Sequence, residues 1–297
     1  NVAVGTNTLA NQDAGATGYN TAVGHNAGLS VTTGVQNTLI GGLAGDGMTT
    51  GGNNTAVGYE SLSSVCTGSY NTAVGRIAMN AMTSGTENTG LGNAALYANT
   101  TGNYNTSVGS DSLKANISGH NNTALGFEAL QVATVSNNTA LGYQAGLLVT
   151  TGANNVVLGH SAGGLVTVGS NNVLLGYKAG NHETSLEGGG GNVLVGPYND
   201  PTTAGTNDAH GFGYNLDCAG GYTTLGESAS DIRAAHGSTT WATVSDQRYK
   251  KDIVDSTTGL SFINALQPRT FKYKTLGELP ETFRAYEADS TEVFKNS

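Results

Sequence analysis

The chain has 297 residues, of which 45 are glycine and 4 are proline; 11% are charged, and the net charge is −9. Abundant glycine with so little proline excludes a collagen-like chain, argues against a disordered linker and is typical of short strands joined by tight turns. There is no basic stripe that could follow phosphates and no run of about 18 apolar residues, so we expect neither nucleic-acid binding nor membrane insertion.

Residues 1–196 are organised by one repeated motif. Asn-x-x-aliphatic-Gly occurs twelve times there, and eight of the eleven intervals between successive motif glycines equal the interval from Gly24 to Gly41. The motif glycines are Gly5, Gly24, Gly41, Gly58, Gly75, Gly92, Gly109, Gly126, Gly142, Gly159, Gly176 and Gly196. A fixed period this short indicates units that cannot bury a face alone and that bury a continuous core by stacking. The sequence therefore predicts an all-β stalk over residues 1–196, a β-solenoid or β-helix with repeats of about 17 residues.

The first residue of the motif is asparagine in every copy. An amide at the same place in each stacked unit predicts a ladder, in which each side chain bonds to the one above and the one below. The expected ladder residues are Asn20, Asn37, Asn54, Asn71, Asn88, Asn105, Asn122, Asn138, Asn155 and Asn172. Repetition in every unit favours an architectural role over contact with a ligand.

The two faces of the predicted strand differ in composition. Threonine or valine at the second motif position and an aliphatic residue at the fourth share one face, because side chains alternate along a strand. Asparagine and a mostly small third residue share the other face. Both faces carry apolar atoms, so one is expected to pack on the chain's own core and the other to meet a partner chain. A flattened monomeric solenoid that buries both faces is the alternative.

Residues 1–196 give little support to other chemistry. The threonine column would suit an ice-binding surface, but it gives way to valine after Thr139. Calcium-binding nonapeptide repeats need an acidic residue in each turn, and the six histidines lack metal-ligand spacing, so we predict no metal and no cofactor. Cys66 and Cys218 do not make a disulfide framework. No catalytic carboxylate pair stands out, and the stalk itself is expected to be non-enzymatic.

The period ends at Gly196, and Pro197 and Pro201 follow within the next few positions. Two closely spaced prolines predict a boundary. Residues 197–244 are richer in aromatic side chains, and we interpret them as a small β neck or cap that protects the last edge of the solenoid. An extended linker is the alternative.

Residues 245–297 differ in composition from everything before them. They hold eight basic and eight acidic side chains, against three and eight in residues 1–196. Leu260 to Leu266 has helical periodicity, and Arg269 to Lys274 alternates like a strand. This segment is predicted to be part of a separate α+β domain.

The junction carries the pattern Ser-Asp-x-Arg-x-Lys-x-Asp-Ile from Ser245 to Ile253, followed by an apolar stretch and an aromatic strand. It resembles the endosialidase-type intramolecular chaperone domain, which stands at the C-terminus of many phage tail fibres and tailspikes. The resemblance covers residues 245–297, which correspond to the first part of a longer domain. It implies at most a single-turnover serine peptidase, with Ser245 as nucleophile and Lys250 as general base. The cleaved bond would be Ser245–Asp246 or one adjacent to it. Lys251 as the base, or an inactive cap with surface charges, are the alternatives.

The same resemblance implies a function. The chaperone would bring three chains together, set their register and then be released, leaving a homotrimeric structural fibre of a virion. Expected partners are other virion tail proteins and a glycan or protein receptor on the host surface. The expected location is the virion, outside the cell, and the host cytoplasm during assembly. A bacterial trimeric autotransporter adhesin head and a polysaccharide-degrading tailspike are the rival interpretations.

Overall fold

The computed structural model describes residues 1–13, 18–228, 230–238 and 242–243. The chain divides into two compact units, Asn1–Ser245 and Asp246–Ser297, and the described residues all lie in the first. All regular secondary structure in the described residues is β-strand. The helix and strand predicted after residue 245 lie outside the described residues.

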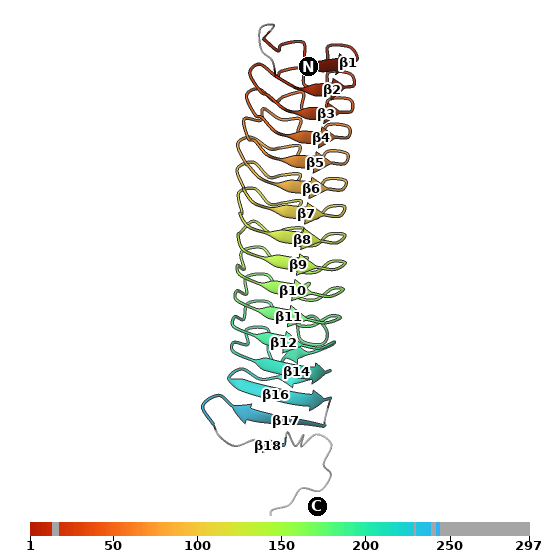
Figure 1. The fold of residues 1–297 in the computed structure, drawn as a ribbon. Helices are drawn as coiled ribbons and strands as arrows, with labels where there is room; N and C mark the ends of the chain where they lie inside the picture. Colours follow the sequence, from red (N-terminus) through yellow and green to blue (C-terminus); the bar gives the residue numbers. More distant parts are fainter. Residues whose placement is uncertain (14–17, 229, 239–241, 244–297) are drawn as a thin grey trace, which may run out of the picture. The chain divides into compact units, whose positions relative to one another are not determined.

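The first unit is a coil whose successive turns, here called rungs, each add one strand to a growing sheet (Figure 1). The sheet has 16 strands in the order β1 to β12, β14, β16, β17, β18, and β13 pairs with β15 in a second sheet. The strands are β1 Val2–Val4, β2 Thr21–Val23, β3 Thr38–Ile40, β4 Thr55–Val57, β5 Thr72–Val74, β6 Thr89–Leu91, β7 Thr106–Val108, β8 Thr123–Leu125, β9 Thr139–Leu141, β10 Val156–Leu158, β11 Val173–Leu175, β12 Val193–Val195, β13 Asp200–Pro201, β14 His210–Tyr214, β15 Asp217–Cys218, β16 Tyr222–Glu227, β17 Ser230–Ala235 and β18 Ala242–Thr243.

Equivalent motif residues lie side by side in neighbouring strands. Thr21 pairs with Thr38, which pairs with Thr55, and the same parallel register is kept along the repeats. The predicted all-β solenoid, with repeats of about 17 residues, is therefore confirmed. Only the second to fourth motif residues form a strand, and turns and loops make up the remainder of each regular rung.

The core lies inside the coil. The middle residue of each strand from β2 to β12 is buried, as with Ala22, Leu39 and Leu174. The residue three places after the motif glycine, such as Ala27 or Ser61, is also buried inside the coil. Small residues are frequent at these places, and larger side chains such as Leu62 and Met79 fill the rest of the interior.

The motif glycine is required by the backbone. After strands β2 to β11 its φ lies in the positive region that side chains rarely adopt, as at Gly24 (φ 142°) and Gly41 (φ 134°). A Cβ atom on Gly24 would lie 2.3 Å from the carbonyl oxygen of Gly41 in the next rung. Both the positive φ and the close approach of two rungs therefore exclude a side chain.

The parallel sheet continues beyond Gly196. Strand β12 pairs with β14, and β14 pairs with β16, both in parallel. Strands β17 and β18 then join in antiparallel orientation. In the described part of the chain the sheet therefore holds fourteen parallel strands before its direction changes.

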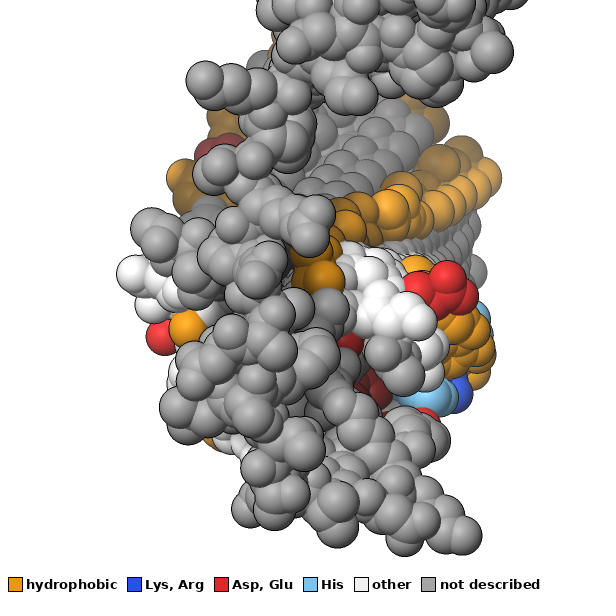
Figure 2. Space-filling model, turned by 90° about the horizontal axis from the view of Figure 1, so that it is seen from below, with side chains coloured by type: hydrophobic (Ala, Val, Ile, Leu, Met, Phe, Trp, Pro, Cys, Tyr) orange, Lys and Arg blue, Asp and Glu red, His pale blue; other side chains and the backbone are white. Residues whose placement is uncertain are grey.

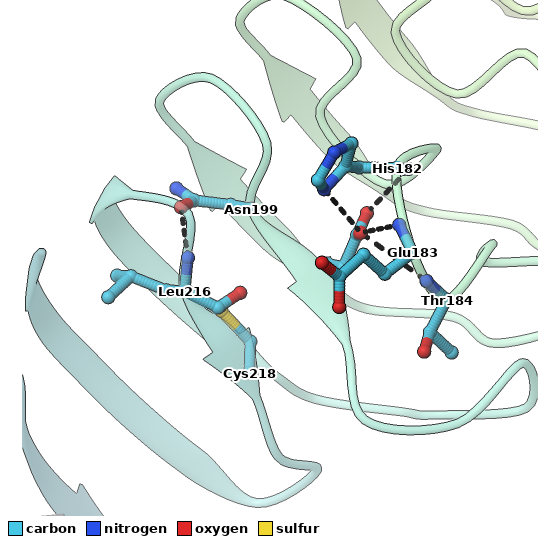
Figure 3. A network of polar contacts seen from close by, with 7 residues as sticks. His182, Glu183, Thr184, Asn199, Leu216 and Cys218 are labelled. Atoms are coloured by element: carbon cyan, nitrogen blue, oxygen red, sulfur yellow. Dashed lines mark hydrogen bonds and ion pairs between the residues drawn. The ribbon is translucent and has the colours of Figure 1, made fainter. Parts of the chain in front are cut away.

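The long loop of the last motif unit is held by a buried carboxylate. Asp200, which is 2% exposed, accepts hydrogen bonds from the backbone N–H groups of His182 (3.0 Å), Glu183 and Thr184 (3.4 Å) (Figure 3). Burial raises the pKa of Asp200, and the three backbone donors oppose that shift. The extra residues between Gly176 and Gly196 are thus accommodated without breaking the stack.

Candidate functional site

The residues that sequence reasoning placed at a cleavage site lie outside the described residues. These are Ser245, Asp246 and Lys250. The last described strand, Ala242–Thr243, ends just before them. What the first unit presents instead are three columns of side chains that run from rung to rung.

The first column consists of the motif asparagines inside the coil. All ten predicted ladder residues are at most 1% exposed. The backbone N–H of Asn37 donates to Oδ1 of Asn20 (2.8 Å), and the backbone N–H of Asn54 donates to Oδ1 of Asn37 (2.9 Å). The amide nitrogen Nδ2 of Asn37 donates to the carbonyl oxygen of Gly51 (2.9 Å). Nine of the ten side chains link their strand both to the next strand and to a glycine carbonyl in this way, and Nδ2 of Asn122 donates instead to the carbonyl oxygen of Val135 (2.7 Å).

Side chain to side chain bonds are added in part of this column. Nδ2 of Asn88 donates to Oδ1 of Asn71 (3.1 Å), and Nδ2 of Asn105 donates to Oδ1 of Asn88 (3.1 Å). Asn192 continues the column, donating from its backbone N–H to Oδ1 of Asn172 (3.0 Å). A primary amide can accept from one rung and donate to another because its acceptor oxygen and its two N–H donors are on different atoms of one short side chain. A carboxylate has no donor, and a hydroxyl has a single donor on the same atom that accepts.

The second column is the outward face of the parallel sheet, formed by the first and third residues of strands β1 to β12. We call it the outer face. Its first positions are all threonine or valine and its third positions all valine, isoleucine or leucine. None of these side chains from β2 to β12 is buried, and Leu125 and Leu141 are 44% and 42% exposed. Hydrophobic side chains gather in ridges along the stacked rungs (Figure 2).

The third column consists of aromatic side chains that come just after the strands, or at their ends, in the later rungs. Its members are Phe127, Tyr143, His160, Tyr177, Tyr198 and Tyr214. Successive ring centres lie 4.8 to 5.8 Å apart. Most of these rings stand directly after the motif glycine, and comparing that one position across the units would have revealed the column from the sequence. Stacking between rungs stabilises the coil in addition to the amide ladder.

The two cysteine thiols are not exposed reactive groups. Both are buried and free, and burial raises the pKa of Cys66 to about 11 and that of Cys218 to about 12. No three His, Cys, Asp or Glu side chains converge as metal ligands anywhere in the described part of the chain. The described residues also include no helix with the length and apolarity needed to cross a membrane.

Comparison with known proteins adds one finding. Residues 245–291 match the Peptidase_S74 family, described as the chaperone of endosialidase. The C-terminal segment is thus a partial endosialidase chaperone domain that follows a β-solenoid stalk. Neither the curated proteins nor the solved structures gave a match to the chain.

Proposed function

We propose that this chain is a shaft segment of a homotrimeric virion fibre that takes part in attachment to a host surface. Residues 1–196 would be the stalk, residues 197–244 its neck, and residues 245–297 the start of a chaperone that assembles the trimer and then removes itself. The observation that carries the proposal is the family match over residues 245–291, because such chaperones are typical of phage tail fibres and tailspikes and this one follows a solenoid.

The repeat gives a physical reason for a dedicated chaperone. Along the outer face one rung is nearly identical to the next, so copies displaced by a whole rung would make almost the same contacts as copies in register. A domain that fixes register before the shafts meet removes this ambiguity. Its later release would leave a kinetically trapped trimer, because chains that came apart could not easily find the same register again and would refold slowly without the chaperone.

The proposed release is a single cleavage at Ser245. A serine hydroxyl is a weak nucleophile until a base takes its proton, and Lys250 is the proposed base. A lysine can act in this way only when it is neutral, and the positive charges of Arg248 and Lys251 beside it in the sequence favour the neutral form. Because the target bond belongs to the same chain, proximity replaces a substrate pocket.

Expression from the complete gene tests this proposal. The parent should give a trimeric fragment whose new C-terminus, read by intact mass, lies at Ser245 or one residue away. Ser245→Ala should stay uncleaved and still form a trimer, whereas Ser256→Ala, a neighbouring serine outside the junction, should be cleaved like the parent. If parent and Ser245→Ala give the same uncleaved chain, self-processing is wrong.

The base is tested by a second pair of variants. Lys250→Met should abolish cleavage, while Lys251→Met should leave most of it. The reverse outcome would assign the base to Lys251. Attachment is tested separately, by measuring whether the purified trimer binds host cells and competes with intact virions for them.

A further inference from the structure

We propose that the outer face is the surface through which the copies of this chain meet, packed in parallel and in register along the length of the shaft. This inference rests on the trimeric assembly proposed above and names the residues that form it. The occupant of the face is therefore the same face of the neighbouring copies.

The charge distribution selects this surface. Residues 1–244 carry 4 basic and 13 acidic side chains, so copies of the shaft repel one another over most approaches. The outer face holds none of these charges in any of the twelve strands β1 to β12. It is the surface on which negatively charged copies can approach over many rungs without bringing carboxylates together.

Burial points to the same surface. A parallel sheet normally has both of its faces covered. The inner face here packs on the chain's own core, but the described residues of the chain leave the outer face open from β2 to β12. Its aliphatic third positions form a continuous column of exposed and half-buried side chains, which in a monomer would be an unusual apolar surface.

The size of the face is adequate for a specific contact. Its twelve strands at a spacing of about 4.8 Å give a length of about 55 Å, and three extended residues give a width of about 10 Å. In a trimer three such faces would meet, each contributing about 550 Å², and together they would bury about 1,650 Å², which is above the roughly 1,000 Å² expected of a biological interface.

The repetition of the face selects the occupant. A partner that contacts every rung must present matching groups at one strand spacing over a dozen repeats, and another copy of this chain does so. The aromatic column offers no equal surface, because it spans only the later rungs and has Lys178 beside it, with Nζ 5.7 Å from the Tyr177 ring centre.

A matched pair of charge substitutions tests the inference. Leu125 on the outer face and Ile117 away from it are 44% and 52% exposed, so a single shaft should tolerate lysine equally at both. We expect Leu125→Lys to shift the molar mass, measured by light scattering on the cleaved shaft, from three chains to one. Ile117→Lys should keep the three-chain mass, and circular dichroism should show the same β content in both variants.

Cysteine cross-linking provides an independent readout that does not disturb folding. Thr106 lies on the outer face and Thr101 lies in a loop of the same coil, and both are exposed. With a short bismaleimide, Thr106→Cys should give a covalent two-chain species and Thr101→Cys should not. The native thiols contribute little background, because both are buried.

The outcomes separate this inference from the proposed function. A parent trimer whose Leu125→Lys variant is still trimeric, and whose Thr106→Cys variant does not cross-link, would overturn the interface and leave the trimer standing. A parent with the mass of one chain would overturn both. If Leu125→Lys does not fold, the cross-linking pair decides.

Discussion

Removing one amide from the ladder should destabilise the shaft far more than removing an exposed amide. In Asn37→Ala, two buried backbone groups lose the partner that the side chain provided. These are the N–H of Asn54, which donates to Oδ1 at 2.9 Å, and the carbonyl oxygen of Gly51, which accepts from Nδ2 at 2.9 Å. Each buried polar group left without a partner costs about 1–3 kcal/mol, so the free energy of unfolding should fall by about 2–6 kcal/mol.

The assay is guanidinium unfolding of the cleaved shaft, followed by circular dichroism at fixed protein concentration. Asn93→Ala is the control, because Asn93 is exposed and its substitution should change the free energy of unfolding by less than about 0.5 kcal/mol. Equal small losses in the two variants would refute the ladder as a source of stability.

Asn37→Asp sharpens the same test. The carboxylate keeps the acceptor for Asn54 but places an oxygen opposite the carbonyl of Gly51, so burial should raise the pKa of the new group. The protonated acid can donate where the amide did. Stability of this variant should therefore be greatest at low pH and should fall as the pH rises through the raised pKa, relative to the parent. A difference from the parent that does not vary with pH would contradict this reasoning.

Three further predictions follow from single positions. Gly41→Ala should lower the free energy of unfolding by at least about 1–3 kcal/mol, because a Cβ there meets positive φ and lies 2.6 Å from the oxygen of Gly58. A Cβ on the neighbouring Gly42 would meet only the Tyr59 ring, at an ordinary contact distance of 3.5 Å, so Gly42→Ala should change the free energy of unfolding little in the same guanidinium titration. Equal effects of the two substitutions would refute the close approach of the rungs at Gly41. Burial and the neighbouring His236 lower the pKa of His210, so its contribution to stability should be complete above about pH 6.5 and be lost as the pH falls below that value. In a plot of melting temperature against pH, His210→Gln should make this decline shallower, and an unchanged plot would contradict the reasoning. The two native thiols, with pKa values raised to about 11 and about 12, should react with a maleimide at about pH 7.5 only after unfolding; labelling of the folded shaft, detected by mass, would show that they are not buried.

Much of the fold follows from the sequence because the repeat restates the same physical constraint many times. The strict spacing of asparagine and glycine predicts the register, and the alternation of residues within the strand predicts which residues share a face. The stack also continues where the motif stops. Ala209 stands in the place of the asparagine in the next rung, but its backbone N–H still donates to Oδ1 of Asn192 (2.9 Å). The stacked backbone thus continues for a further rung in which alanine replaces the motif asparagine.

Local backbone conformation was not predictable in the same way. Leu62, Leu96 and Leu113 have φ between 48° and 53°, a left-handed conformation that normally favours glycine or asparagine. Their side chains are fully buried in the core, and this burial offsets the strain. Leucine ordinarily adopts strand or helix conformations, so these turns cannot be located from the residue type alone.

For the functional residues, the sequence was informative in a different way. The junction at Ser245 was recognisable because its charge and motif differ from the stalk, although its geometry lies outside the described residues. The outer face needed the structure, because the sequence left open which of two partly apolar faces would stay exposed. Burial resolves that choice, with the threonine and aliphatic columns outward and the asparagine column inward.

Deleting one whole rung tests directly whether each repeat of the motif forms one layer of a continuous stack. Removing residues 93–109 joins Gly92 to Ser110 and leaves every other rung intact, whereas removing residues 93–100 cuts a rung in the middle. Small-angle X-ray scattering on the two shafts gives their length and cross-section. We expect the first deletion to keep the cross-section and to shorten the shaft by about 4.8 Å, and the second to disrupt the coil. Equal tolerance or equal collapse of the two deletions would contradict it.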